Sequence, residues 1–562
     1  MNDALSLVEP SRPRAPIRPA ATLILLRDTP QGPEVFMQRR SPGAAFLGGA
    51  YVFPGGALEA ADADPRVLQR VTGLTDAEAS ARLALPAGAL SYWVAAAREC
   101  FEEAGILLAR DETGAPAAPE RVAALAPQRD ALNRGALAFA DLLVGHGLRL
   151  PADELVYFDH WITPPVRPRR FDARFFVARA PHGQEGSHDD GEAVHSVWLR
   201  PAEALERGER SEMEIAFATR FMLRELARFA TVDEAIAHAR AKGPIESNRP
   251  VVAQGAAGQR IFRRGDTAYA EIHWCDPEET TQTTYDLVPG VPKRLDRLVT
   301  RVIAPNPGRM TGPGTNTYLV GADELAVIDP GPALDAHVDA ILACGGARIR
   351  WILCTHTHRD HSPAARALRA ATGAQVVGLP PPAGASQDEG FGPDRQPGHG
   401  ERLAVAGITL RALRTPGHAS NHVCYLLEET RMLFAGDHVM QGSTVVINPP
   451  DGDMRAYVAS LEALLGEDIA VIAPGHGYLV GTPQREIRHL IRHRAWREAR
   501  VLGALSRRDG ATCAELVPDV YAEVPARLHD VAARSLLAHL AKLVADGRVR
   551  ADDGGRYFLA LR

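Results

Sequence analysis

The feature that most constrains this chain is the segment THTHRDH at residues 355–361, which directly follows the apolar run IRWIL. A strand that ends there places three imidazoles and a carboxylate on one short loop. Imidazoles and carboxylates at this density match borderline metals such as Zn²⁺. The candidate ligands, all of which follow apolar runs, are His356, His358, Asp360, His361, His418, Asp437 and His476. Because a tetrahedral zinc needs only about four ligands, this set favours a site for two ions.

The order of these residues, H-x-H-x-D-H followed by His, Asp and His, resembles that of the metallo-β-lactamase fold hydrolases. The resemblance implies three ligands for one zinc ion, which are His356, His358 and His418. It implies three ligands for a second zinc ion, which are Asp360, His361 and His476. Asp437 would bridge both ions. Two zinc ions activate a shared water for hydrolysis, and Asp360 would be the catalytic residue that orients it.

A second group of candidate ligands lies in the string RECFEEAGI at residues 98–106. On a helix, Glu99, Glu102 and Glu103 lie at positions i, i+3 and i+4, so their carboxylates share one face. Such oxygen ligands suit Mg²⁺ or Mn²⁺, which would neutralise a diphosphate and position an attacking water. Arg98 is placed to reach Glu102 at i+4 and to orient it. For an isolated acidic trio, a solvated helix face would be the better interpretation.

That string resembles the Nudix box, downstream of a matching FPGG at residues 53–56. In the family pattern, five residues separate the glycine from a glutamate. Counting from Gly56, this chain has Asp62 at that position in place of Glu. Positions 63–97 then intervene before Arg98, so an insertion splits the box. The resemblance implies that Glu102 and Glu103 are catalytic and that Glu99 joins them as a metal ligand.

Two further segments resemble the Nudix subgroup that includes peroxisomal coenzyme A diphosphatases. They are RRFDARFF at residues 169–176 and VHSVWLRPAEAL at residues 194–205. The resemblance implies hydrolysis of a diphosphate in a nucleotide-containing metabolite such as CoA. A small-molecule nucleotide or a CoA-type compound is therefore the expected substrate.

A length of 562 residues corresponds to roughly three or four folding units. The expected class is α/β multidomain, with a Nudix α/β/α sandwich, a metallo-β-lactamase αβ/βα sandwich and a C-terminal winged-helix-like unit. The expected parts are a disordered tail (1–17), a Nudix-like domain (18–242) with an insertion near 63–90, a connector (243–296), a metallo-β-lactamase domain (297–483) and the winged-helix-like unit (484–562).

Composition describes a globular chain that does not enter a membrane. Hydrophobic residues make up 46% of the chain and the net charge is −6, which excludes a largely disordered protein and a globally basic nucleic-acid coat. No apolar run approaches the roughly 20 residues of a membrane span. The 6 cysteines are widely separated. Together with the lack of a secretory pattern at the start, they predict reduced thiols and a cytoplasmic location.

The bond that the zinc site cleaves is open at this level. The segments 306–321 and 442–454 and the C-terminal unit resemble the β-lactamase-like protein 2 group, whose animal members include a mitochondrial endoribonuclease. This favours a phosphodiester in single-stranded RNA. Arginines of the C-terminal helix would supply a phosphate-binding surface; they are Arg485, Arg488, Arg492, Arg494, Arg497, Arg500, Arg507 and Arg508. The alternative for these arginines is a solvated helix face.

Two other functions fit the same motifs. The metal set also serves glyoxalase-II-type thioesterases, so a glyoxalase-II-like or acyl-CoA thioesterase with a non-catalytic Nudix domain is one alternative. A nucleic-acid-binding regulator that uses the winged unit is another, although a binding module does not require seven metal-site residues. The oligomeric state is open.

Overall fold

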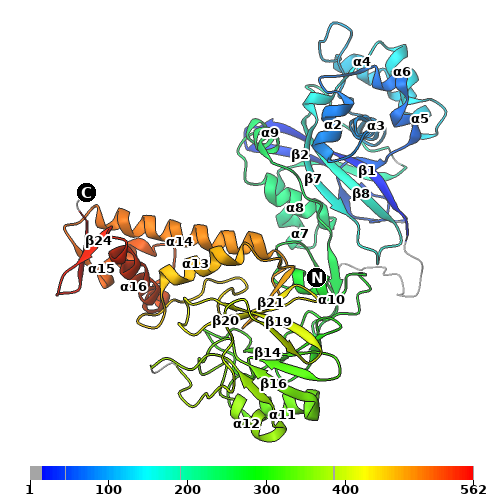
Figure 1. Ribbon diagram of the computed structural model, residues 1–562. Helices are drawn as coiled ribbons and strands as arrows, with labels where there is room; N and C mark the ends of the chain where they lie inside the picture. The colour runs from blue at the N-terminus through cyan, green and yellow to red at the C-terminus, as the bar shows by residue number, and fades with distance from the viewer. Residues whose placement is uncertain (1–14, 45, 190, 384–386, 561–562) are drawn as a thin grey trace. The chain divides into compact units, whose positions relative to one another are not determined.

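The computed structural model describes residues 15–44, 46–189, 191–383 and 387–560, and the chain forms two compact units, Met1–Val252 and Ala253–Arg562 (Figure 1). Of the expected tail 1–17, residues 1–14 lie outside the described ranges, and Ile17 already begins a strand. The boundary between the units falls inside the expected connector 243–296. Within the described ranges, no helix is long and apolar enough to cross a membrane.

The first unit is built on one mixed sheet of seven strands. Its strands are β1 (Ile17–Thr29), β2 (Gly32–Arg40), β3 (Tyr51–Val52), β4 (Gly55–Ala57), β7 (Val156–Ile162), β8 (Arg170–Arg179) and β9 (Ala193–Leu199). The order is β3-β2-β1-β8-β7, with β4 paired to β1 and β9 paired to β2. β1 and β2 form an antiparallel hairpin, and β1 and β8 run parallel.

Helices cover both faces of this sheet. Along β1, Leu23 and Leu25 pack with α3 (Leu90–Ala104), whereas Ile24 and Leu26 pack with the helices that follow β9. These helices are α7 (Pro201–Glu209), α8 (Phe217–Leu226) and α9 (Val232–Ala241). Because strand side chains alternate between faces, a strand buried on both sides reads as a continuous apolar run. The α/β/α sandwich predicted from the sequence is confirmed.

The insertion folds into several short elements. It forms a 3₁₀ turn (Ala60–Ala63), α1 (Pro65–Leu68), β5 (Val71–Thr72) and α2 (Asp76–Leu83). Further elements complete the unit: α4 (Pro119–Ala123), α5 (Ala126–Asn133), α6 (Phe139–Gly145) and β6 (Leu150–Pro151). α3 ends where Gly105 adopts a left-handed conformation (φ 66°), which glycine adopts without steric cost.

The second unit contains a pair of sheets packed face to face. One sheet consists of β12 (Lys293–Arg294), β13 (Val299–Ile303), β14 (Asn316–Val320), β15 (Leu325–Ile328), β16 (Ile349–Leu353) and β17 (Gln375–Val377). The other consists of β18 (Arg402–Val405), β19 (Ile408–Arg414), β20 (Val423–Leu427), β21 (Met432–Gly436) and β22 (Val471–Pro474). Tyr318 and Leu353 from the first sheet share a core with Tyr425 and Phe434 from the second.

Helices cover the outer faces of both sheets, which completes the predicted αβ/βα sandwich. α11 (Asp335–Gly345) and α12 (Ala365–Thr372) pack on the first sheet, and α13 (Met454–Leu464) and α14 (Pro483–Leu505) pack on the second. α14 continues into a C-terminal unit with its own core, visible at the orange and red end of the chain in Figure 1. This unit contains α15 (Cys513–Val520), α16 (His529–Ala545), β23 (Ala511–Thr512), β24 (Val549–Ala551) and β25 (Arg556–Leu559).

Residues of the expected connector from Ala253 onward are part of the second unit. They form β11 (Arg260–Phe262), α10 (Tyr269–Cys275) and β12, and the short strand β10 (Val251–Ala253) contains the boundary itself. Glu271 of α10 is completely buried and bonds both terminal nitrogens of Arg301 at 2.6 and 2.8 Å, together with Lys293 Nζ at 2.7 Å. This ionic cluster fastens α10 to the first sheet.

Replacing Glu271 with Gln is expected to lower the free energy of unfolding of the second unit by about 3–5 kcal/mol, because Arg301 would stay buried without its countercharge. Burial alone would raise the pKa of Glu271, but Arg301 and Lys293 lower it to about 2. The stabilisation is therefore present above about pH 4.5 and is lost as the pH falls toward 2. Urea unfolding of both proteins over this range checks the loss. Asp468→Asn is the control, because Asp468 belongs to an exposed ion pair. Its expected change in the free energy of unfolding is below about 0.5 kcal/mol.

Candidate metal centres

The seven candidate ligands of the second unit meet at one edge of the paired sheets. Four follow β16, and His418, Asp437 and His476 follow β19, β21 and β22. The structure gathers them into two groups, in each of which one ligand atom per residue lies within 4.8 Å of the others. The first group is His356, His358 and His418, and the second is Asp360, His361, Asp437 and His476.

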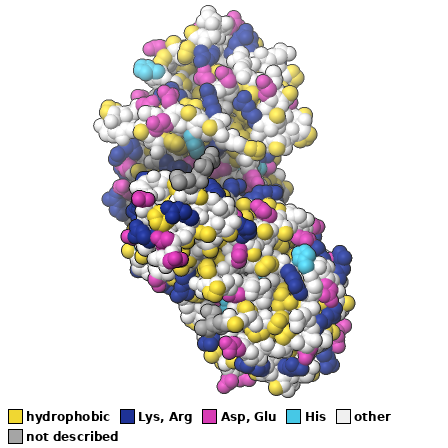
Figure 2. All heavy atoms as spheres, turned by 60° about the vertical axis from the view of Figure 1, so that its left-hand side comes forward, with side chains coloured by type: hydrophobic (Ala, Val, Ile, Leu, Met, Phe, Trp, Pro, Cys, Tyr) yellow, Lys and Arg dark blue, Asp and Glu magenta, His cyan; other side chains and the backbone are white. Residues whose placement is uncertain are grey.

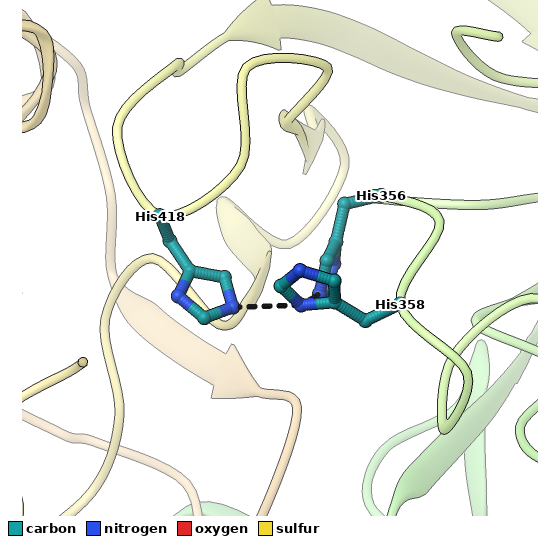
Figure 3. Close-up of side chains that lie close together, drawn as sticks. All are labelled: His356, His358 and His418. Atoms are coloured by element: carbon teal, nitrogen blue, oxygen red, sulfur yellow. Dashed lines mark hydrogen bonds between the residues drawn. The ribbon is translucent and has the colours of Figure 1, made fainter. Parts of the chain in front are cut away.

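In the first group, three imidazoles face one another from two loops (Figure 3). His358 Nδ1 lies 3.0 Å from His356 Nε2 and 3.0 Å from His418 Nε2. The other ring nitrogen of His418 is 2.8 Å from the Val446 carbonyl oxygen. Such a contact fixes the ring orientation and leaves Nε2 facing the group.

Asp437 contacts both groups. Its Oδ2 lies 3.7 Å from His418 Nε2, and its Oδ1 lies 3.5 Å from His361 Nε2 and 3.4 Å from His476 Nε2. Asp360 Oδ2 lies 3.4 Å from His476 Nε2. Asp437 is thus the residue whose two oxygens face different groups.

Burial and neighbouring charges separate the protonation of the two groups. Burial, with the nearby His418 ring, lowers the pKa of His358 to about 4, so this imidazole is neutral at neutral pH and has the form that binds a metal. Burial would also lower the pKa of His476, but the carboxylates of Asp437 and Asp360 raise it to about 9. A cation that binds the second group would therefore displace protons.

The donor atoms fit divalent metal ions. His361 Nε2, Asp437 Oδ1 and His476 Nε2 are buried and have no hydrogen-bond partner. Buried polar atoms normally have hydrogen-bond partners. Three such atoms without partners beside one another therefore indicate a binding site for a ligand. Nitrogen and oxygen donors in tight groups of three and four are the coordination chemistry of Zn²⁺ and related ions.

One member of this site was missed by the sequence analysis. Asp329 directly follows β15 and is buried; its Oδ2 lies 2.9 Å from His361 Nδ1. It also accepts bonds from the Thr355 amide at 2.7 Å and from Thr355 Oγ1 at 2.8 Å. The available signal was its position at the end of the apolar run LAVI, which is the pattern shared by the other ligands.

Asp329→Asn is expected to weaken metal binding by the second group about 10–100-fold, because an amide no longer holds the His361 ring as a charged partner does. Competition with a chromogenic chelator measures the affinity. Asp339→Asn, at an exposed position of α11, is the matched control and should leave affinity unchanged. Equal affinities for Asp329→Asn and the parent protein would contradict this role.

In the first unit, Arg98 connects the two parts of the split box through hydrogen bonds. Its Nε and Nη2 donate to the two oxygens of Asp62 at 2.7 and 3.0 Å, across the whole insertion. Its Nη1 donates to Glu102 at 2.7 Å and to Glu99 at 3.0 Å. Arg98 and Asp62 are both buried. The insertion therefore leaves the pairing between the acid and the arginine intact.

Glu103 is anchored separately from the other two glutamates. Its Oε2 accepts a bond from the Gly55 amide at 2.9 Å and a short bond from Gln38 Nε2. Burial raises the pKa of Glu103 to about 8, and burial also raises the pKa values of Glu99 and Glu102. A Cβ atom at position 56 would lie 2.5 Å from Glu99 Oε1, which explains the glycine there.

These three carboxylates do not converge as the other groups do. Among the described residues, only the two groups of the second unit bring their ligand atoms within 4.8 Å of one another. Glu99, Glu102 and Glu103 share one face of α3 but keep separate partners. Mg²⁺ retains several waters when it binds protein carboxylates, so this wider spacing is compatible with it.

A cavity of about 990 Å³ opens beside the candidate metal ligands of the second unit. His358, Asp360, His418 and Asp437 line one part of it, and residues of α14, α16 and the loop between α15 and α16 line another. Many lining side chains are apolar; among them are Met310, Met440, Val445, Val446, Val524 and Val531. The C-terminal unit thus helps to form the space in front of the ligands.

The predicted phosphate-binding surface of α14 is wrong for two of its arginines. Arg494 and Arg497 are 2% and 3% exposed and line the cavity instead. Arg500 and Arg508 pair with Glu523 and Asp519. On the face drawn in Figure 2, basic and acidic side chains are interspersed.

Comparison with known proteins assigns each part to a family. Residues 63–228 match the NUDT19 Nudix domain, residues 310–476 the Metallo-beta-lactamase superfamily, and residues 512–556 the Beta-lactamase associated winged helix domain. The Lactamase-like protein adaB of Aspergillus niger is 30% identical over 302 residues, which cover 50% of this chain and 90% of the relative. The chain belongs to the metallo-beta-lactamase superfamily.

Other relatives share the metallo-beta-lactamase region. The Beta-lactamase-like protein 2 homolog of Drosophila melanogaster is 32% identical, with 47% of this chain and 93% of the relative covered. The Thioesterase pkgB of Emericella nidulans is 33% identical, with coverage of 42% and 68%. A solved metallo-beta-lactamase family protein from Thermus thermophilus gives a TM-score of 0.41 at 24% identity, with coverage of 47% and 100%.

These relationships establish the predicted combination of domains and a hydrolase. The metallo-beta-lactamase fold implies binding of divalent metal, and Nudix domains use Mg²⁺ or Mn²⁺. The predicted winged-helix-like unit is confirmed, and its sheet consists of β23, β25 and β24.

Proposed function

We propose that the metallo-beta-lactamase domain is a dinuclear zinc thioesterase for acyl thioesters of the CoA type. The observation that carries this proposal is the cavity, which joins the ligand groups to a wall rich in apolar side chains. An acyl chain would bury its surface there while its thioester carbonyl lies at the ligands. The 33% identity to a protein named as a thioesterase supports the same reaction.

The candidate ligands would have separate roles in hydrolysis. His356, His358 and His418 would hold one zinc ion, Asp360, His361 and His476 the second, and Asp437 both. Zinc in such a site supplies an activated water and a positive charge for the carbonyl oxygen. Asp360 is partly exposed and lines the cavity, and it would accept a hydrogen bond from the attacking water. Asp329 would hold the His361 ring in register.

The Nudix domain is proposed as a second, Mg²⁺- or Mn²⁺-dependent site that hydrolyses the diphosphate of a CoA-type nucleotide. Glu99, Glu102 and Glu103 would bind the cation, directly or through its waters. Arg98, held by Asp62, fixes the first two carboxylates. The pKa of Glu103, about 8, is close to neutral pH, which is the range in which a general base is effective.

Cleavage of single-stranded RNA is the second candidate for the zinc site. Trp496 of α14 is 45% exposed, with the exposed Arg492 one turn before it and Arg500 one turn after it, 5.1 Å from the centre of its ring. An aromatic ring between arginines is a stacking platform for bases. Two observations favour the thioester over RNA. Arg494 and Arg497 are buried rather than displayed on the helix surface. The cavity also has few aromatic side chains, whereas a nucleic-acid strand stacks its bases on successive aromatic groups.

Hydrolysis of acyl-CoA, S-acylglutathione and single-stranded RNA by the zinc-loaded protein distinguishes these reactions. The expected result is release of free thiol from acyl-CoA, absent in His358→Ala and retained in Glu102→Ala. Cleavage of RNA without thiol release would replace the thioesterase with the second candidate. Loss of the same activity in both variants would contradict two separate sites.

A further inference from the structure

We propose that the part of the cavity formed by the C-terminal helices binds an anionic group of the substrate, a carboxylate or phosphate, through Arg494. This inference rests on the proposed function for the identity of the substrate, but the anion site itself follows from the residues of α14 and its neighbours. It would make the zinc site selective for acyl thioesters that carry a second, negatively charged end.

Arg494 is a buried cation without a countercharge. It is 2% exposed, and within the described ranges no carboxylate lies at ion-pair distance from it. One Nη2 hydrogen bond goes to the Val445 carbonyl at 2.5 Å, and the guanidinium lies 5.2 Å from the centre of the Tyr457 ring. Its Nε has no partner. Because burying an unpaired charge is costly, a cation that lines a cavity calls for an anion in that cavity.

Neighbouring groups add donors to the same part of the cavity. Tyr521 is 6% exposed and its hydroxyl has no partner. Arg497 Nε is also unpartnered, although its Nη2 donates to Glu523 at 2.6 Å. Arg534 is an exposed lining residue that adds positive charge, whereas Arg309, which also lines the cavity, is paired with Asp530 at 3.1 Å. Donors of this kind suit a carboxylate or phosphate, which accept several charge-assisted hydrogen bonds at once.

Acids that face this region are already engaged. Glu523 pairs with Arg497 and Arg500 at 2.6 and 3.2 Å. Asp451 accepts bonds from Ser420 and from Gln387 Nε2. Burial lowers the pKa of His493, another lining residue, to about 4, so it adds no charge at neutral pH. The balance of charge around the unpartnered donors is therefore positive.

Binding of simple thiols to the zinc-loaded full-length protein tests this site without requiring hydrolysis. The probes are mercaptoalkanoates of increasing chain length and mercaptoalkanols of the same length, compared by calorimetry. The thiol binds at the zinc site in both series, and only the alkanoates carry a second anionic group. We expect the alkanoate to bind at least about tenfold more tightly at one length. Mercaptoalkyl phosphates of that length show whether phosphate or carboxylate is preferred.

Arg494→Met should abolish this preference while the alkanols keep their affinity, and Arg488→Met, exposed on the same helix, should preserve it. Tyr521→Phe should reduce the preference severalfold, and provides a milder variant if Arg494→Met does not fold. No preference at any chain length in the parent protein would overturn the proposal, as would a preference that survives Arg494→Met. An intact preference in a protein that hydrolyses no thioester would instead reject the proposed function alone.

Discussion

Asp437→Asn is expected to lower thioester turnover by more than about a hundredfold and to reduce bound zinc from two ions per chain to one or fewer. Even a residue that merely supports a metal ligand costs about 10–100-fold when it is removed. Asp437 has a larger role, because its two oxygens face His418 on one side and His361 and His476 on the other. An amide supplies neither the charge nor a second anionic oxygen.

Turnover with acyl-CoA and elemental analysis of the desalted protein measure both effects. Asp468→Asn, at an exposed ion pair of the same unit, should retain full activity and full zinc. Unchanged turnover in Asp437→Asn with one zinc per chain would show that Asp437 does not bridge two ions.

Glu103→Gln is expected to remove the diphosphate hydrolysis of the first unit by at least about a hundredfold and to leave thioester hydrolysis unchanged. The amide would keep the bond to the Gly55 amide but lose the negative charge that a cation and a general base require. Release of phosphopantetheine-containing product from CoA in Mg²⁺ or Mn²⁺ measures the first activity.

The control for this variant is Glu112→Gln, at an exposed glutamate of the same unit. It should cleave CoA at the parental rate. If Glu103→Gln retained full diphosphatase activity, the assignment of the helix carboxylates as the reaction centre would be wrong. If it lost thioester hydrolysis as well, the two sites would not be independent.

The convergence of the candidate metal ligands in the second unit was predictable because each one directly follows the end of a strand. A short apolar run followed by His or Asp places that side chain at a sheet edge, and the edges of packed sheets coincide. His356, His418 and Asp437 illustrate this, since they follow three different strands and still meet.

Features that depend on distant contacts were not predictable. Asp329 also follows a strand, but it contacts Nδ1 of His361, the ring nitrogen that faces away from the other candidate ligands. The sequence does not show which ring nitrogen a neighbouring acid contacts. Arg494 and Arg497 lie on the buried face of α14 with Ile487, Leu490 and Val501, and their charge rather than their spacing suggested exposure. Likewise, Glu271 looked like part of a polar connector, and only its pairing with Arg301 reveals a buried ionic cluster.

The most direct test of the account is a zinc titration of the metal-free full-length protein, with bound zinc and acyl-CoA hydrolysis measured at each step. We predict that turnover reaches its maximum at two zinc ions per chain, and that His358→Ala binds fewer ions and stays inactive. Full turnover at one zinc per chain, or two bound zinc ions without release of thiol from acyl-CoA, would contradict a dinuclear thioesterase.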